Sequence, residues 1–142
     1  MKTFHGPVFI AQFLSIAVVM LVAASCSSVA PTSRTGAVHT INVAEGPDPE
    51  ELSVRAGDEV RWVNLRTQSI EIDLVKVNPE TLSCNRGFFD ALKFARDFAT
   101  LNPNESASAC FVISGDVNYN IRMESALPGG QKIVSGVVRV GN

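Results

Sequence analysis

Residues 52–74 read LSVRAGDEVRWVNLRTQSIEIDL, and this stretch decides the fold. Apolar and polar residues alternate through 52–55, 60–64 and 70–74, and the residues AGDE at 56–59 interrupt the first two of these runs. Period-two alternation broken by turn residues is typical of antiparallel strands with one buried face. The stretch therefore predicts a strand, a tight turn, a strand, a loop and a third strand.

Further strands are predicted on both sides of this stretch. Four more segments alternate in the same way or are rich in β-branched residues: 38–43, 107–113, 117–124 and 133–140. Val75 and Val77 are expected to extend the strand at 70–74 until Asn78 and Pro79 end it. Roughly seven short strands, with turns every eight to twelve residues, favour an all-β Greek-key β-sandwich.

Residues 88–99 (FFDALKFARDFA) depart from the period of two. Their apolar residues recur at helical spacing, and the charged residues lie mostly on the opposite face. This pattern predicts one short amphipathic helix. Its phenylalanines are expected to cover a sheet edge or one end of the sandwich, and a partner-binding face is the alternative.

The amino-terminal segment has the pattern of an export signal. Lys2 precedes an apolar run at 8–24, which ends in small residues. Residues 21–26 (LVAASC) resemble a bacterial lipobox, in which the cysteine becomes the lipidated first residue of the mature chain, although Ala23 stands where leucine is usual. We therefore predict a lipoprotein signal peptide over 1–25 and lipidation of Cys26. The alternatives are an uncleaved anchor helix and a soluble secreted product.

Residues 26–37 (CSSVAPTSRTGA) are small, polar and interrupted by proline. Such residues bury too little apolar surface to order themselves, so this segment is predicted to be a lipid-anchored flexible linker. The sandwich domain then spans 38–142. Ser27, rather than an aspartate, follows Cys26 and resembles the outer-membrane sorting pattern of cells with two membranes.

Cysteine usage and charge narrow the class of protein. The chain has three cysteines, and if Cys26 carries lipid, Cys84 and Cys110 form an even pair. In an oxidising compartment the default for such a pair is a disulfide, and two free thiols available to a metal are the alternative. The formal net charge is −2, and the lysines and arginines are scattered, so no nucleic-acid surface is predicted.

Residues 52–64 (LSVRAGDEVRWVN) resemble the cupredoxins, the plastocyanin-like blue-copper domains. Members of that family typically carry a valine strand, an Ala-Gly-Asp turn and then Val-x-Trp-x-Asn. Residues 101–106 (LNPNES) resemble the loop before the penultimate strands, 115–119 (GDVNY) the family's Gly-x-Tyr-x-Tyr, and 135–140 (SGVVRV) its closing strand. The resemblance covers roughly residues 38–141 and implies a cupredoxin-like fold.

The resemblance also implies a copper site, with two histidines, a cysteine and a weak axial ligand. On this alignment the four positions hold Ile70, Ile121, Glu124 and Val134. His39 is the only histidine after the predicted signal peptide, and one imidazole cannot supply two ligands. We therefore predict no type-1 copper site and no cofactor.

No enzymatic site is predicted. The sequence has no glycine-rich phosphate loop and no serine in a nucleophile elbow. His39 is expected to be an edge-strand surface residue, and Glu71 and Asp73 a solvated strand face rather than an acid–base pair or a site for a hard cation. Met123 is expected in the core. Binding of Cu(I) by Met123 and two reduced cysteines is the alternative.

Taken together, these patterns predict a non-catalytic binding or assembly module of the cell envelope. It would contact the membrane through a lipid on Cys26 and would have a protein partner in the envelope. The alternatives are a copper-handling or electron-transfer cupredoxin with an atypical site, and an enzyme whose site the sequence does not reveal.

Overall fold

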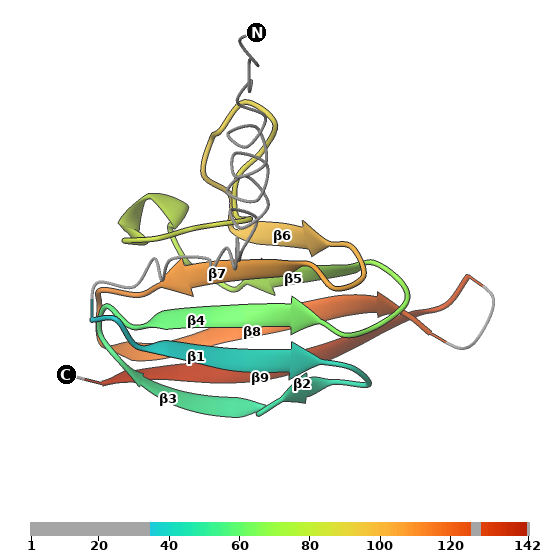
Figure 1. Ribbon diagram of the computed structural model, residues 1–142, viewed down its shortest axis with the longest axis horizontal. Helices are drawn as coiled ribbons and strands as arrows, with labels where there is room; N and C mark the ends of the chain where they lie inside the picture. The colour runs from blue at the N-terminus through green and yellow to red at the C-terminus, as the bar shows by residue number, and fades with distance from the viewer. Residues whose placement is uncertain (1–34, 126–128, 142) are drawn as a thin grey trace, which may run out of the picture. The chain divides into compact units, whose positions relative to one another are not determined.

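The computed structural model describes residues 35–125 and 129–141, whose strands form two sheets packed as layers of a sandwich (Figure 1). The predicted signal peptide, the lipidation site Cys26 and most of the linker lie outside the described residues and stay predictions. Among the described residues no helix is both long and apolar enough to cross a membrane.

Each sheet combines antiparallel pairs with one parallel pair. The first sheet has the order β2 (Pro47–Asp48), β1 (Val38–Val43), β4 (Glu59–Asn64) and β7 (Ser106–Cys110). The second has the order β3 (Glu51–Arg55), β9 (Gln131–Gly141), β8 (Gly115–Glu124), β5 (Ile70–Leu74) and β6 (Phe98–Leu101). The parallel pairs are β1 with β4 and β3 with β9. Because the chain crosses repeatedly from one sheet to the other, the connections produce the predicted Greek-key sandwich.

The core lies between the two sheets and follows the period of two. On β8 the buried residues are Tyr119, Ile121 and Met123, so the expectation that Met123 is a core residue is confirmed. Trp62 of β4 is fully buried, and its ring meets that of Tyr119 edge to face at a centroid distance of 5.4 Å. The alternation read from the sequence thus corresponds to one face per strand turned inward.

A close approach between β8 and β9 requires a glycine. Tyr119 is paired with Gly136, and a Cβ atom at position 136 would lie 2.2 Å from the Tyr119 hydroxyl oxygen and 2.8 Å from the Glu50 carbonyl oxygen. Neither neighbour is the end of a long flexible chain. The tyrosine ring therefore occupies the space that any larger residue would need.

Two predicted strands end earlier than expected. The strand at 70–74 stops at Leu74, because Lys76 takes a φ of 57° and turns the chain before Val77. The strand predicted at 107–113 stops at Cys110. The next carbonyl, that of Phe111, accepts a hydrogen bond from the Gly57 amide instead of a sheet neighbour.

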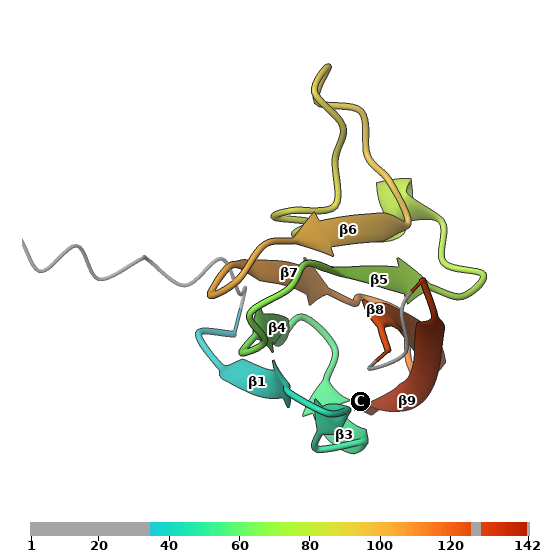
Figure 2. The same cartoon turned by 90° about the vertical axis from the view of Figure 1, so that its right-hand side faces the viewer.

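The prediction of a helix over 88–99 is wrong. Residues 87–97 form a projecting loop that we call the arm, and 98–101 are strand β6 at the edge of the second sheet (Figure 2). In the arm Phe89 and Ala95 form an isolated antiparallel bridge. The helical part of the described chain is the single 3-10 turn η1 (Pro79–Thr81).

Local hydrogen bonding explains why the helical spacing did not produce a helix. The Asp90 carboxylate accepts hydrogen bonds from the backbone amides of Leu92 and Phe94, at 2.9 and 3.0 Å. Aspartate side chains that bind nearby amides offer the backbone an alternative to the helix. Lys93 then takes a φ of 67°, which closes the turn at the end of the arm and is incompatible with a right-handed helix.

Candidate functional site

The end of the sandwich where the family resemblance implies copper is filled by aliphatic side chains. Ile70 and Ile121 are buried in the core, and Val134 is partly buried against it. Ile70 pairs with Met123 across β5 and β8, and Ile121 pairs with Val134 across β8 and β9. Three of the four positions where the resemblance implies ligands therefore hold aliphatic side chains that belong to the core or pack against it.

The remaining position of that set is on the surface. Glu124 is exposed, and its Oε2 atom accepts a hydrogen bond of 2.8 Å from Gln68. Within residues 35–125 and 129–141 no group of three or more His, Cys, Asp or Glu side chains is placed to hold a metal ion. The described domain therefore does not carry the ligand set of a type-1 copper centre.

His39 lies at the other end of the first sheet. It pairs with Val60 near the start of β4, and its Nε2 atom is 3.0 Å from Oδ2 of Asp58. Asp58 also accepts hydrogen bonds from the Thr35 hydroxyl and, at 3.0 Å, from the Arg55 amide. The Thr35 hydrogen bond, followed by the Arg55 amide, lowers the pKa of Asp58 despite its burial. This cluster fastens the Ala-Gly-Asp turn to β1, which is a structural role.

The paired carboxylates on β5 form the solvated strand face that the sequence predicts. Glu71 and Asp73 both bind Arg122 of β8, at 2.6 and 3.3 Å, and all three side chains are partly exposed. Since each carboxylate is already paired with the guanidinium, this face is an ordinary cross-strand ion cluster.

The sequence pattern does not reveal that Glu59 is buried, because this residue directly follows the turn residues at 56–58. Glu59 is fully buried, and its Oε1 atom accepts hydrogen bonds from Arg61 at 2.6 Å and from Ser108 at 2.7 Å. These contacts join β4 to β7 inside the first sheet. A buried charge is tolerated when it is paired in this way, so Glu59 is a cross-link within the sheet.

The disulfide predicted from the cysteine count is confirmed. Cys84 and Cys110 are bonded to each other, and the Cys110 amide also donates a hydrogen bond of 3.0 Å to the Cys84 carbonyl. Met123 lies near the far end of β8, where it pairs with Ile70. The structure therefore does not bring Met123 and the two cysteines together as a Cu(I) site.

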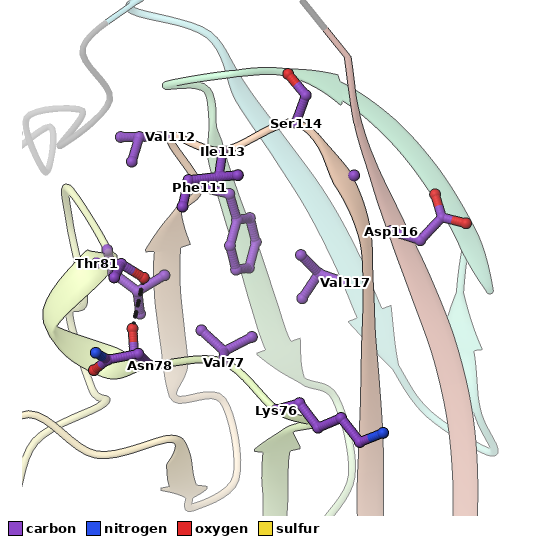
Figure 3. Close-up of a pocket in the computed structure, with 12 residues that line it drawn as sticks. Lys76, Val77, Asn78, Thr81, Phe111, Val112, Ile113, Ser114, Asp116 and Val117 are labelled. Atoms are coloured by element: carbon purple, nitrogen blue, oxygen red, sulfur yellow. Dashed lines mark hydrogen bonds between the residues drawn. The ribbon is translucent and has the colours of Figure 1, made fainter.

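An apolar pocket opens between η1 and the loop that joins β7 to β8 (Figure 3). Its volume is about 310 Å³, and Val77, Phe111 and Val117 point toward one another across it. On its outer side Val112 and Ile113 are 42% and 67% exposed. The disulfide at Cys110 fixes the start of this loop, so one wall of the pocket is held in place by a covalent bond.

The arm is fixed at its base and apolar at its tip. Phe88 is fully buried, with its ring 5.8 Å from the Trp62 ring, and a Cβ atom at Gly87 would lie 2.8 Å from that of Ala107. At the tip, Leu92 and Phe94 are 75% and 65% exposed. The expectation that these phenylalanines cover the sandwich thus holds for Phe88 and is wrong for Phe94.

No family model and no curated protein matches the chain. Solved structures do match. An oxidised amicyanin variant is 21% identical, with a TM-score of 0.49, over 75% of this chain and 84% of that one. A reduced amicyanin variant is 18% identical, with a TM-score of 0.49, over 73% and 82%. A purple cupredoxin from Nitrosopumilus maritimus is 20% identical, with a TM-score of 0.44, over 72% and 98%.

These neighbours are cupredoxins, and at such identities the likeness concerns the fold. The structure has the features on which the resemblance rests: two sheets packed as a sandwich, the Ala-Gly-Asp turn between β3 and β4, and the buried Trp62 on β4. The described domain is a cupredoxin-like β-sandwich in which Ile70, Ile121, Glu124 and Val134 occupy the positions expected for type-1 copper ligands.

Proposed function

We propose that the protein is a non-catalytic binding module of the cell envelope, anchored to a membrane through a lipid on Cys26. One contrast carries the proposal. The interior positions that would serve copper are closed by aliphatic packing, whereas large apolar side chains are exposed on the arm and beside the pocket. Exposed apolar patches on a soluble domain mark surfaces that bind something.

Two observations support an extracytoplasmic location. The domain contains a disulfide, and disulfides persist in exported proteins and are rare in the cytosol. The amino-terminal pattern of Lys2, the apolar run at 8–24 and Cys26 agrees with export and lipidation. Both point to a domain outside the cytoplasm, held near a membrane by its amino-terminal end.

The exposed residues suggest where a partner binds. Val112 and Ile113 are exposed beside the pocket, which lies between the segments of η1 and of the loop that follows the disulfide-bonded Cys110. Ile133 on β9 is also exposed, at 59%, but it lies on the regular strand surface away from these segments. It therefore provides a matched control for the binding surface.

The test is purification of the full chain from detergent-solubilised membranes, with and without prior cross-linking. Mass spectrometry of the Cys26 peptide should show the lipid. A protein recovered in stoichiometric amount with wild type and Ile133→Ser, but lost with Ile113→Ser, would support a binding module. Unmodified Cys26 in the mature protein would refute the anchor. Stoichiometric, tightly bound copper would refute the exclusion of metal chemistry.

A further inference from the structure

We propose that the tip of the arm inserts into the lipid surface of the membrane to which the protein is anchored. This inference rests on the proposed anchoring through Cys26 and adds a second, non-covalent contact with the same bilayer. The occupant of the exposed apolar tip is then lipid, in the region between the headgroups and the acyl chains.

The arm is held in position by its base. Phe88 is packed in the core against Trp62, and the Arg96 amide donates a hydrogen bond of 2.9 Å to the Phe88 carbonyl. Just before the arm, Cys84 is joined to Cys110 at the end of β7. The projection visible in Figure 2 therefore rests on a covalent bond and a buried ring.

The turn at the tip is ordered by Asp90. Its carboxylate accepts hydrogen bonds from the backbone amides of Leu92 and Phe94, and its Oδ2 atom forms a salt bridge of 2.7 Å with Arg96. These contacts leave the side chains of Leu92 and Phe94 directed outward, at 75% and 65% exposure. Because the turn is already formed, little conformational entropy remains to be lost when the tip meets another phase.

The chemistry of the tip fits a lipid interface. Residues 91–95 (ALKFA) contain two large apolar side chains, one lysine and no acidic group. The Lys93 ammonium lies 4.6 Å from the centre of the Phe89 ring, which is itself 39% exposed. Leucine and phenylalanine reach the acyl boundary in interfacial segments, while lysine keeps its charge among the headgroups.

The first strand of the described domain starts near the segment that leads into the arm. Val38 pairs with Glu59, and Glu59 pairs with Cys110, so the start of β1 lies in one row with Cys110, whose disulfide partner Cys84 comes three residues before the arm. Two strand spacings separate Val38 from Cys110, about 10 Å. Thr35, the first described residue, follows Cys26 by nine residues.

This spacing keeps the tip near the bilayer. Nine residues span at most about 30 Å, so a lipid on Cys26 would hold the arm within a few nanometres of the membrane. Because the lipid anchor would keep the tip at a high effective concentration at the bilayer, even a small apolar contact would add to membrane binding. The bilayer is thus the apolar phase that the tip would meet most often.

The experiment reads the environment of the tip in the full lipidated chain, reconstituted in phosphatidylcholine vesicles. Trp62 is the sole tryptophan and is fully buried, so a second indole introduced by Leu92→Trp reports on the tip. Ile133→Trp places an indole on the exposed surface of β9 as the control. Acyl-chain bromine is expected to lower the added emission of Leu92→Trp by about half or more, because interfacial side chains reach about 5–10 Å into the lipid, and to leave Ile133→Trp unchanged.

The outcomes separate this inference from the proposed function. Quenching of the tip alone supports it. A lipidated Cys26 with no quenching at the tip overturns it and leaves the anchor intact. A blue shift of the tip emission without bromine quenching also overturns it, because the tip would then be covered by protein, such as a second copy. Unmodified Cys26 overturns the anchor and this inference together. Phe94→Trp repeats the test should Leu92→Trp fail to fold.

Discussion

Removing the disulfide should destabilise the domain by an amount that follows from its place in the chain. The perturbation is the double substitution Cys84→Ala and Cys110→Ala. The bond closes a separation of 26 residues. In the chain-entropy treatment a loop of that length corresponds to roughly 3.5 kcal/mol at 25 °C. Cys110 is fully buried, so truncation of its sulfur adds a packing cost, and we expect a total of about 3–5 kcal/mol.

The assay is equilibrium unfolding in urea, followed by the fluorescence of Trp62. Its indole is buried in the core and packs against Phe88 at the base of the arm, so it reports on both. For a domain of this size the expected loss corresponds to a midpoint shift of about 2–3 M urea. Each single alanine variant should show most of the effect, since either one breaks the bond.

Two results would refute this reasoning. One is a midpoint shift below about 0.5 M in the double variant, which would mean that the loop is not constrained in the way the bond implies. The other is the presence of two reactive thiols at positions 84 and 110 in denatured protein isolated without reductant. Wild type treated with reductant is the internal control and should behave as the double variant does.

Other substitutions test the packing and the charged turn. Gly136→Ala forces a Cβ atom to within 2.2 Å of the Tyr119 hydroxyl oxygen and should cost about 1–3 kcal/mol or more in urea unfolding, whereas Gly46→Ala, with nothing within 4 Å, should be close to neutral. Phe88→Ala removes the buried ring at the base of the arm and should cost about 3–5 kcal/mol, with faster proteolysis of the arm as a second readout. Hydrogen bonds lower the folded-state pKa of Asp58, so its contribution to stability is present above the unfolded pKa, about 3.9, and is lost as pH falls through the folded value. The urea concentration at the midpoint of unfolding should therefore decrease as the pH is lowered below about 4, and Asp58→Asn should weaken this pH dependence of the midpoint. The same pH profile in Asp58→Asn as in wild type would contradict this role of Asp58.

Much of the sandwich could be predicted because its signals are local. The alternation at 60–64 and 70–74 and the Ala-Gly-Asp turn each act over a few residues, and the structure confirms strands β4 and β5 there. The disulfide followed from the even pair, Cys84 and Cys110, that remains if Cys26 carries lipid. The unsuitability of the copper positions followed from the count of histidines and from Ile70 and Ile121, both of which are now seen in the core.

The arm could not be predicted because its spacing is ambiguous. Phe88 and Ala99 are both buried, as a helical stripe requires, but Phe88 packs against Trp62 of the first sheet, whereas Ala99 pairs with Ile72 in the second. The decisive feature is the Asp90 carboxylate, which binds two backbone amides and ends any helix before Lys93. Such competition between a side chain and the backbone leaves no mark on the hydrophobic period.

The exposed apolar residues could not be predicted for a similar reason. Ile113 was expected to continue a strand, and Phe94 to cover the sandwich, because apolar residues are usually buried. Exposure depends on where β7 ends and where the arm projects, and the bond between Cys84 and Cys110 joins the end of β7 to the segment before the arm. A long-range contact of this kind is not visible in any window of a few residues.

The most direct test of the central claim is the visible spectrum of the purified, oxidised protein during titration with Cu(II). The account predicts no intense absorption at about 600 nm and no stoichiometric retention of copper after dialysis, because aliphatic side chains occupy three of the four ligand positions and the cysteines are bonded to each other. An intense blue band with one tightly held copper per chain would contradict it.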